Sequence, residues 1–595
     1  MKKKLKVIWE LALVLMIVMG ITGCKAKEPA GPEETVITVL ATSDLHGKLF
    51  PWDYVSDQED KSGSMFQLAN AVKANYAKDS TLLVDAGDTV QDNFAEIFLQ
   101  DEIHPMMKML NEIGYDVWTT GNHEYDFGMD ITERLIREFE GHAIVSNLYG
   151  PDGKRMTEPY AIFEKKGVRI AVLCMVTPNI ARWNPKYLAG YTVTNPIDET
   201  RLLLKELEGK YDILLGVHHM GFEDENEVEG SGVRSYLKYF PEFDAVIASH
   251  EHKMTVKREV HGMLVVENAP FAASVMRIDF TMTKGEDGWE KKDTAQKTIM
   301  VSEYEPDEAM MREYRDCDRR IREYISNEIG TMHGDAPLVK EGELKGTELP
   351  SAMLEPSALI TLYNSVFRCY AETDVSCAAV LRKSINLKPG PLTVRDLGGI
   401  YPFPNKLCKV KMNGKQLRKL MEWSADAYST FHRGDLTLSF EPGTIEYNYE
   451  IFSGVNYEID VSKEKGSRIV NLTWPDGRPV KDEDEFEAAM TTYRYGSTCS
   501  EFGTAFTEEE GLPELIDADV RSDLGGIRGM LMDYVENVLH GDLYPKTENN
   551  WRIVGYEWDE DLHALAVDLI NRGKLDLENG TRSVTEEDVR QAEVG

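Results

Sequence analysis

The sequence predicts an α/β fold for the first half of the chain and a second domain after it. From residue 36 to about residue 300, apolar runs rich in β-branched residues alternate with amphipathic helical patterns, which is typical of an α/β layer. The chain has 595 residues, more than a single domain usually holds. Its composition, 42% hydrophobic and 28% charged, is that of a globular protein.

The predicted strands and helices follow one another along this first half. The strands are TVITVLATSD (35–44), STLLVDAGD (80–88), VRIAVLCMV (168–176), DILLGVHH (212–219) and FDAVIASHEH (243–252). The clearest helices between them are SMFQLANAVKANYA (64–77) and IHPMMKMLNEIG (103–114). Ligands of such layers bind beyond the carboxyl ends of the strands, where the polar residues of this sequence also fall.

Three further segments complete the predicted organisation. Residues 301–345 form a connecting helix and linker, with a charged helical pattern over 302–332. Residues 346–558 form the second domain, which contains the helix SALITLYNSVFRCYA (357–371). Residues 559–595 are an acidic helical segment interrupted by the turn-rich NRGKLDLENGTRS.

The N-terminus has the pattern of an exported lipoprotein. Residues 1–24 combine a basic start, MKKKLK, with an apolar run and the sequence ITGC, so we predict a lipoprotein signal peptide with lipidation at Cys24. The alternative is a transmembrane anchor, but the apolar run is short for a span of about 20 residues. Residues 25–35 then form a tether. We expect the protein on the outer face of the bacterial cytoplasmic membrane or outside the cell.

The net charge limits the class of partner. The chain has 66 Lys and Arg residues against 102 Asp and Glu residues, a formal net charge of -36. This charge repels polymeric nucleic acid and anionic lipid, so we expect a small-molecule ligand and contact with a membrane only through the lipid. Cys369 and Cys377 could form a disulfide, but we expect mostly buried free thiols.

Pairs of potential ligands occur at five successive strand ends. They lie in the stretches SDLHG, VDAGD, GNHE, GVHHMG and SHEH, and their residues are Asp44, His46, Asp85, Asp88, Asn122, His123, His218, His219, His250 and His252. About seven carboxylate, imidazole and amide ligands suit two divalent cations. Because side chains alternate along a strand, the residues of Asp-x-His and His-x-His are expected to point the same way from a strand.

This order of motifs resembles the calcineurin-like metallophosphoesterases. The resemblance implies a four-layer αββα sandwich over residues 36–300 and two divalent ions of undetermined identity, such as Mn, Zn or Co. One ion would be held by Asp44, His46, Asp88 and His252, and the second by Asp88, Asn122, His219 and His250. His219 is preferred to His218 because HMG matches the family pattern.

The same resemblance assigns roles within TTGNHEYDFG (119–128). His123 would face the phosphoryl group as an acid or charge stabiliser, and Asp126 would orient its imidazole. Glu124 and Tyr125 are interpreted as structural, His218 as a strand residue and Asp85 as a residue that shapes its turn.

The C-terminal half is similar to the substrate-binding domain of the 5'-nucleotidase family. YPFPN, EWSA and FSGVNYEID are most like its 2',3'-cyclic-nucleotide 2'-phosphodiesterase/3'-nucleotidase branch. In that branch two aromatic rings sandwich the nucleobase, and Tyr447 and Tyr493 match those positions, with Tyr449 and Tyr495 as alternatives. Stacking needs only flat rings and tolerates any base.

Two loops depart from the family pattern and leave the substrate open. In 378–390 the usual Gly-rich loop is short, and Arg382 or Lys383 would replace its arginine, with Arg395 as a further candidate to offset phosphate charge. In 491–506 the base-contacting Asn is replaced by Thr492.

The resemblance therefore predicts an exported phosphoesterase that uses metal-activated water. Its expected substrates are 2',3'-cyclic nucleotides and 3'-nucleotides, which it would convert to nucleosides and phosphate. The alternatives are a 5'-nucleotidase or UDP-sugar hydrolase, and a non-catalytic nucleotide-binding surface lipoprotein.

Overall fold

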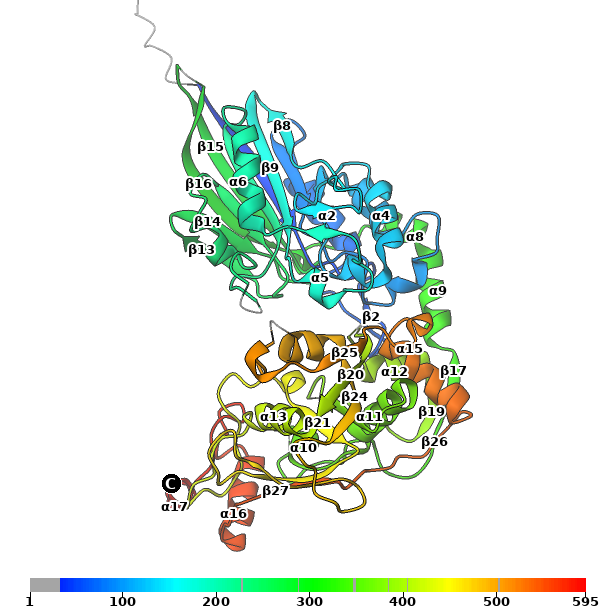
Figure 1. Cartoon of the computed structure of the whole chain (residues 1–595). Helices are drawn as coiled ribbons and strands as arrows, with labels where there is room; N and C mark the ends of the chain where they lie inside the picture. Colours follow the sequence, from blue (N-terminus) through cyan, green and yellow to red (C-terminus); the bar gives the residue numbers. More distant parts are fainter. Residues whose placement is uncertain are drawn as a thin grey trace, which may run out of the picture.

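The chain folds into two domains that face each other across an interdomain pocket. A computed structural model describes residues 33–594 except 226–227, 287, 346–348, 384, 404 and 501–502. The predicted signal peptide, Cys24 and most of the tether lie outside the described residues. Figure 1 shows the N-terminal domain, the C-terminal domain and helix α9 (Arg315–Ile325), which runs along one side between them.

The N-terminal domain is built on two six-stranded sheets. The first has the order β16 (Trp289–Met300), β15 (Ser274–Lys284), β1 (Glu34–Thr42), β4 (Thr81–Asp85), β5 (Val117–Trp118) and β6 (His142–Ala143). The second has the order β13 (Thr255–Val260), β14 (Met263–Glu267), β12 (Ala245–Ala248), β11 (Ile213–His219), β9 (Val168–Val176) and β8 (Ala161–Lys165). All five predicted strands are therefore present.

Alternating side chains along these strands divide the core into layers. Val39 packs between the two sheets, whereas its neighbour Leu40 packs under the outer helices of the first sheet. Leu215 and Leu214 divide in the same way in the second sheet. The outer helices are α2 (Met65–Asn75), α3 (Pro105–Ile113) and α4 (Met129–Glu138) on one side and α6 (Pro196–Leu207) and α7 (Val233–Tyr236) on the other. The predicted four-layer αββα sandwich is confirmed.

Parallel pairing brings the carboxyl ends of the central strands to one edge. Strand β1 is parallel to β4, and β4 to β5. In the second sheet β9, β11, β12 and β14 are parallel to one another. The loops that leave these strands therefore meet at the edge that faces the C-terminal domain.

The connection between the domains differs from the prediction at its end. The charged stretch forms α8 (Glu308–Glu313) and α9, but Glu328–Met332, predicted as helical, is strand β17. This strand pairs with β19 (Gly390–Thr393) and β26 (Asp542–Leu543). A Cβ at Gly330 would lie 2.5 Å from the backbone oxygen of Gly541. Pairing with distant segments has thus overridden the local helical pattern.

The C-terminal domain surrounds a second mixed sheet. Its strand order is β21 (Glu450–Ser453), β18 (Val375–Ala379), β24 (Glu485–Thr491), β20 (Leu407–Asn413) and β25 (Glu514–Asp517). A three-stranded sheet of β23 (Ile469–Thr473), β22 (Asn456–Asp460) and β27 (Trp551–Val554) lies beside it. The principal helices are α10 (Ser351–Leu354), α11 (Ala358–Ala371), α12 (Val394–Ile400), α13 (Gly414–Ala425) and α15 (Ile527–Asp533).

The acidic C-terminal segment packs against this domain. It forms α16 (Glu560–Asn571) and α17 (Glu586–Val594), and the turn between them bonds back to the segment 435–440. Leu436 N donates to Val584 O at 2.7 Å, and Phe440 N donates to Gly580 O at 2.8 Å. Val584 and Val589 are fully buried, so the segment extends the core of the domain.

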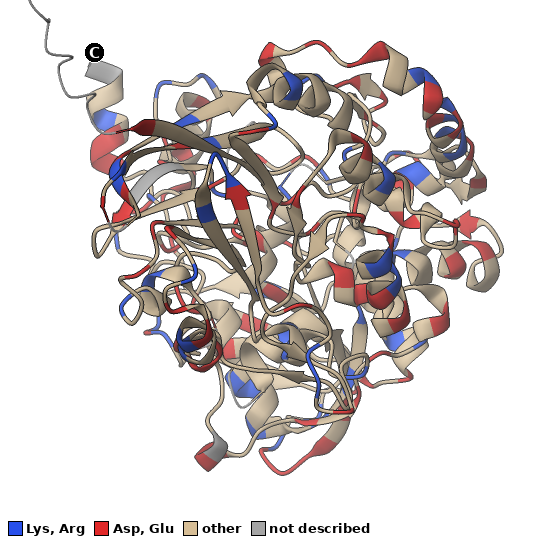
Figure 2. Cartoon of the chain, turned by 90° about the horizontal axis from the view of Figure 1, so that it is seen from above, with Lys and Arg blue, Asp and Glu red and all other residues tan. Residues whose placement is uncertain are grey.

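Several sequence-level expectations concern the chain as a whole. All six cysteines in the part of the chain that the structure describes are free. Among the same residues, no helix has the length and apolar character required to cross a membrane. Acidic residues are spread over both domains rather than confined to one tail (Figure 2).

A buried histidine predicts acid sensitivity of the N-terminal domain. His104 caps α3, where its Nδ1 accepts from Met106 N at 3.2 Å and its Nε2 donates to Ala95 O at 3.1 Å. Burial lowers its pKa to about 4. The unfolded chain takes up this proton first, so the stabilisation is complete above about pH 6.5 and is lost as the pH falls toward 4.

His104→Asn keeps a capping acceptor but does not titrate. Between pH 7 and pH 5 we therefore expect the free energy of unfolding of wild type to fall by about 2 kcal/mol more than that of His104→Asn. Urea unfolding of both proteins at the two pH values measures this difference. His261→Asn, at an exposed position, is the control. If the difference in free energy of unfolding between wild type and His104→Asn is the same at both pH values, the lowered pKa of His104 is wrong.

Candidate metal centre and interdomain pocket

Two triads of potential metal ligands lie at the common edge of the sheets. Asp44, His46 and His252 form one triad, and Asp88, His219 and His250 form the other. Within each triad the ligand atoms lie within 4.8 Å of one another. His46 Nε2 and His252 Nε2 are 2.8 Å apart in the first triad.

Asp88 and Asn122 complete the cluster. Asp88 Oδ2 lies 3.2 Å from His219 Nε2 and 3.9 Å from His46 Nε2, so it faces both triads. Asn122 Oδ1 lies 2.9 Å from His219 Nε2 and 2.8 Å from His250 Nδ1. The structure therefore brings together all seven residues that the sequence predicts as ligands.

The protonation pattern of the cluster fits cations. His219 Nδ1 is 2.7 Å from Ala86 O, to which it must donate, so His219 Nε2 turns a lone pair toward the oxygens of Asp88 and Asn122. Asp44 Oδ2 is buried without a hydrogen-bond partner. Lone pairs that converge without donors need positive charge between them.

The pKa of His219 also indicates that the cluster requires positive charge. Burial alone would lower this pKa, but the carboxylate of Asp88 raises it to about 9 in the chain without metal. A proton on His219 and a divalent cation are thus alternative ways to supply the missing charge.

The backbone at the ligands corrects one expectation from the sequence. The Asp-x-His and His-x-His residues do not lie on strands, because β1 ends at Thr42 and β12 at Ala248. Five ligands lie in turns after the strands with left-handed backbone, with φ values of 52° at Asp44, 46° at His46, 57° at Asp88, 80° at His250 and 58° at His252. Such φ values are costly for residues other than glycine, so these turns, not strand alternation, aim the ligands.

A buried carboxylate holds two of these turns together. Glu124 accepts from the backbone N of Asp88 at 3.1 Å, of Thr89 at 2.7 Å and of Gly121 at 2.6 Å. A Cβ at Gly121 would lie 2.0 Å from Asp88 Oδ1. The structural role predicted for Glu124 is thus to bind the loop of Asp88 to the loop of Asn122.

Two other residues of the motifs have structural contacts. Asp85 accepts from Thr42 Oγ1 at 2.7 Å and from Gly87 N at 3.0 Å, so it lies inside the turn before Asp88. His218 is fully buried, and its Nδ1 accepts from Met175 N at 3.2 Å.

His123 and Asp126 form a hydrogen-bonded pair beside the cluster. His123 Nδ1 donates to Asp126 Oδ2 at 2.7 Å, which leaves Nε2 as the free ring nitrogen. Burial alone would lower the pKa of His123, but Asp88 and Asp126 raise it to about 10. In the chain without metal, the carboxylates around His123 therefore favour the protonated form of its imidazole.

Three residues that contact the ligand histidines were not predicted from the sequence. Gln91 Oε1 is 2.8 Å from His46 Nδ1, and Glu225 Oε2 is 3.2 Å from His250 Nε2. Trp183 stacks on His250 with ring centroids 5.5 Å apart. Gln91 lies three residues after Asp88, where a motif-based search could include it, but nothing in the acidic stretch around Glu225 distinguishes it.

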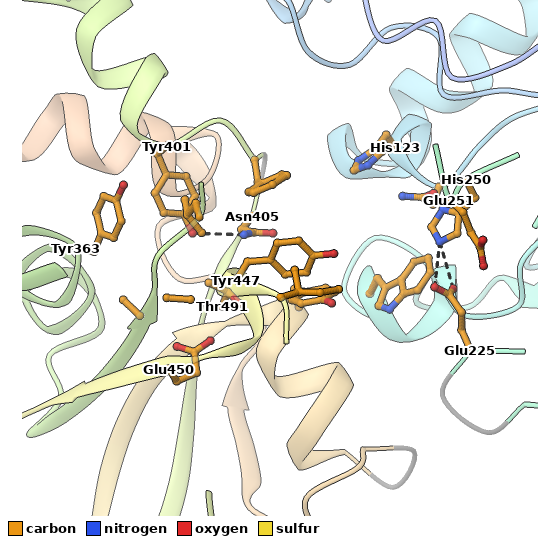
Figure 3. Close-up of a pocket in the computed structure, with 18 of the residues that line it drawn as sticks. His123, Glu225, His250, Glu251, Tyr363, Tyr401, Asn405, Tyr447, Glu450 and Thr491 are labelled. Carbon is orange, nitrogen blue, oxygen red and sulfur yellow. Dashed lines mark hydrogen bonds and ion pairs between the residues drawn. The ribbon is translucent and has the colours of Figure 1, made fainter. Parts of the chain in front are cut away.

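A cavity of about 450 Å³ opens from the cluster toward the C-terminal domain. In Figure 3, His123, Glu225 and His250 lie on one side, and Tyr363, Tyr401, Tyr447 and Glu450 lie on the other. The lining therefore combines metal-cluster residues with aromatic rings of the second domain, as a pocket for a phosphate ester with a flat group requires.

The two tyrosines predicted to stack on a base both line this pocket. Their ring centroids are 6.3 Å apart at an angle of 75°, so the rings of Tyr447 and Tyr493 meet edge to face and would have to turn to sandwich a base. Tyr493 is 39% exposed and therefore has room to turn. Of the alternatives, Tyr449 is buried and hydrogen-bonded to Tyr428, and Tyr495 Oη donates to Pro513 O at 3.4 Å.

The predicted arginines lie in other surroundings. Arg395 forms an ion pair with Asp57 of the N-terminal domain at 3.0 Å. Arg382 is exposed and lies over the ring of Phe403, 5.8 Å from its centroid. A different arginine, Arg494, is buried behind the pocket and paired with Glu450 at 2.7 Å. Local pairing, not phosphate, accounts for the position of Arg395.

Comparisons with known proteins agree with this geometry. Residues 37–254 match the family model of the calcineurin-like phosphoesterases, and residues 329–508 match that of the 5'-nucleotidase C-terminal domain. The chain is 25% identical over 608 residues to a 2',3'-cyclic-nucleotide 2'-phosphodiesterase/3'-nucleotidase of Haemophilus influenzae, with 88% of each chain covered.

Two further matches extend the comparison. A trifunctional nucleotide phosphoesterase protein of Bacillus subtilis is 24% identical over 616 residues, which span 91% of this chain but 40% of that relative. A putative 5'-nucleotidase from Staphylococcus aureus has a similar fold, with a TM-score of 0.72, 21% identity and coverage of 87% of this chain and all of that one.

Removal of Asp88 should abolish stabilisation by metal. A ligand at 1,000 times its dissociation constant stabilises the folded state by about 4 kcal/mol, so we expect manganese to raise the unfolding temperature of the chelator-treated wild type. Asp88→Asn should show little or no such increase, because Asp88 faces both triads. His261→Ala, at an exposed position outside the cluster, should respond as wild type does. An equal response of Asp88→Asn, measured by calorimetry, would refute the proposed cluster.

Proposed function

The chain belongs to the 5'-nucleotidase family of calcineurin-like phosphoesterases, and from this premise we propose that it is an exported, lipid-anchored enzyme that hydrolyses 2',3'-cyclic nucleotides and 3'-nucleotides to nucleosides and phosphate. The observation that carries the proposal is the cluster of converging lone pairs beside His123, at the mouth of a pocket lined by Tyr447 and Tyr493. Phosphate and base would thus contact different domains.

The residues of the cluster divide between two metal ions. Asp44, His46, Asp88 and His252 would hold one ion, and Asp88, Asn122, His219 and His250 the other. When bound, two divalent ions lower the pKa of water and offset the charge of the phosphoryl oxygens.

His123 supplies the protein's own part of the chemistry. With Nδ1 bound to Asp126, its Nε2 is free to donate to a phosphoryl oxygen or to the leaving oxygen. Asp126 accepts the hydrogen bond from Nδ1 and so fixes the rotation of the imidazole. The rings of Tyr363 and Tyr401 give the inner part of the pocket an aromatic lining.

The proposed substrate class follows from the relatives and from the pocket. Several relatives that cover most of the chain are named as cyclic-nucleotide phosphodiesterases and 3'-nucleotidases. Tyr447 and Tyr493 offer flat rings without groups that select one base, which suits an enzyme acting on several nucleotides.

The proposed anchor is compatible with an open pocket. Lipidation at Cys24 would place the membrane on the N-terminal side of Glu34, where β1 begins. The nine residues of β1 separate Glu34 from the ligand turn, about 30 Å at the rise of a strand. The pocket therefore lies at the opposite end of β1 from Glu34.

A parallel substrate panel tests the proposal. Residues 25–595 with manganese should release phosphate from 3'-AMP, and open and dephosphorylate 2',3'-cyclic AMP, faster than they act on 5'-AMP or UDP-glucose. The cyclic assay needs separation of nucleoside products, because ring opening alone frees no phosphate. Preference for 5'-AMP or UDP-glucose would replace the proposal by a 5'-nucleotidase or UDP-sugar hydrolase. Binding without turnover of any ester would favour a nucleotide-binding lipoprotein.

Substitution of His123 separates catalysis from binding. We expect His123→Ala to lower kcat by about 10²–10³-fold, the usual contribution of a positioned acid, while a nucleotide still binds with near wild-type Kd by calorimetry. His142→Ala, at an exposed histidine, is the control. Unchanged kcat in His123→Ala would exclude its proposed role.

Substitution of Tyr493 tests base stacking. Stacking on an aromatic side chain contributes about 1–3 kcal/mol per base, so Tyr493→Ala should raise KM roughly tenfold with a smaller change in kcat. Tyr493→Phe should keep the wild-type KM, since only the ring is required. Tyr544→Ala, at a tyrosine that is 61% exposed, serves as the control. If Tyr493→Ala and Tyr544→Ala have the same KM, Tyr493 does not stack on the base.

A further inference from the structure

A lysine of the C-terminal domain is buried against the N-terminal domain. Lys406 directly precedes β20 and is 9% exposed. Its Nζ donates to Asn184 Oδ1 at 2.6 Å and lies 3.9 Å from the centroid of the Tyr187 ring. Asn184 and Tyr187 follow α5 (Ile180–Trp183) of the N-terminal domain. The contact therefore exists only while the two domains are docked as they are here.

From Asn184 the contacts continue to the catalytic histidine. Asn184 Nδ2 donates to Asp126 Oδ1 at 3.2 Å, and Asp126 Oδ2 accepts from His123 Nδ1 at 2.7 Å. Lys406, Asn184, Asp126 and His123 all line one cavity of about 90 Å³. Each oxygen of the Asp126 carboxylate thus has one partner, and its plane is held from both sides.

The Lys406 ammonium and the Asp126 carboxylate together decide which way the Asn184 amide points. An ammonium group has donors only, so the atom of Asn184 that faces it must be the oxygen. The amide nitrogen then faces Asp126 and donates to it. Asn184 is 4% exposed, and its side chain bonds to Lys406 at one end and to Asp126 at the other. Without the ammonium, the amide oxygen loses its charged partner, and the side chain of Asn184 is held at one end only, by Asp126.

We propose that Lys406 is a positioning residue for His123, acting through Asn184 and Asp126, so that docking of the C-terminal domain fixes the imidazole at the metal centre. This inference rests on the proposed role of His123 in phosphoester hydrolysis. Lys406 need not touch the substrate, because its ammonium is already bound by Asn184 and the ring of Tyr187.

The same residue is linked to the proposed base-binding tyrosine. Thr492 N donates to Lys406 O at 2.9 Å, and Tyr493 follows Thr492. The ion pair of Lys186 and Asp519, 3.8 Å apart, joins the domains as well. Docking of Lys406 therefore coincides with presentation of Tyr493 to the pocket, which would allow chemistry only when the substrate-binding half is in place.

A double-mutant cycle tests the proposal in the full-length enzyme. The variants are Lys406→Met, Asp126→Asn and the two combined, with Lys409→Met as a matched control. Lys409 lies on β20 as well, but it pairs with Glu487 at 3.1 Å. Contacting residues couple by about 0.5–3 kcal/mol, so we expect Lys406→Met to lower kcat about tenfold with KM nearly unchanged.

The combined variant should be no slower than Asp126→Asn alone, because Lys406 acts through Asp126. Lys406→Arg keeps the donors and should recover most of kcat. Equal losses of kcat from Lys406→Met with and without Asp126→Asn would overturn the proposal, as would a loss confined to KM, which would indicate direct contact with substrate. Wild-type kcat in Lys406→Met would overturn it too.

A second measurement needs no turnover. In crystal structures of the manganese-loaded wild type and Lys406→Met, we expect the Asn184–Asp126 hydrogen bond in the first and its loss in the second. Retention of this bond in Lys406→Met would overturn the proposal. If the wild type hydrolyses none of the four esters, the proposed function fails, and this comparison alone decides whether Lys406 orients Asn184.

Discussion

The negative potential of the ligand cluster is the main constraint on the N-terminal domain, because the turns that carry the ligands must hold mutually repelling atoms close together. Oxygens of Asp88 and Asn122 face the lone pair of His219, and only a proton or a cation relieves their repulsion. The repulsion between these ligand atoms would move them apart if the backbone did not restrain them. Left-handed turns at five ligands, the backbone contacts of Glu124 and the close approach at Gly121 supply that restraint.

The two domains contribute different parts of the proposed site. The N-terminal sandwich carries the ligands and His123, whereas the aromatic walls of the pocket come from the C-terminal domain. Neither domain alone encloses the pocket. His123 is linked to the C-terminal domain by a series of hydrogen bonds. Its partner Asp126 accepts from Asn184, and Asn184 accepts from Lys406 across the interface.

Basic residues of the C-terminal domain mostly serve structure. Arg395 pairs with Asp57 across the domain interface, and Arg494 is buried with Glu450 behind the pocket. In a chain with a net charge of -36, these two arginines are already paired, and Lys253 is the basic residue that lines the described pocket. Under the proposed function, metal ions at the cluster and His123 would offset the phosphate charge, because local positive charge can override the field of an acidic protein.

The sequence by itself determined an α/β layer, because apolar β-branched runs such as the one around Val39 and Leu40 alternate with amphipathic helical patterns. The resemblance to the calcineurin-like metallophosphoesterases then implied the four αββα layers. The sequence also placed ten potential ligands at successive strand ends, and the resemblance selected the seven residues of the cluster from among them. Only the tertiary structure decided how they are aimed, because left-handed turns depend on distant contacts such as those of Glu124. Gln91, Glu225, Asn184 and Lys406 escaped prediction for the same reason: each acts on a side chain far from it in sequence or in a different motif, and no local pattern records such a contact. The strand β17 likewise required partners found only in the folded chain.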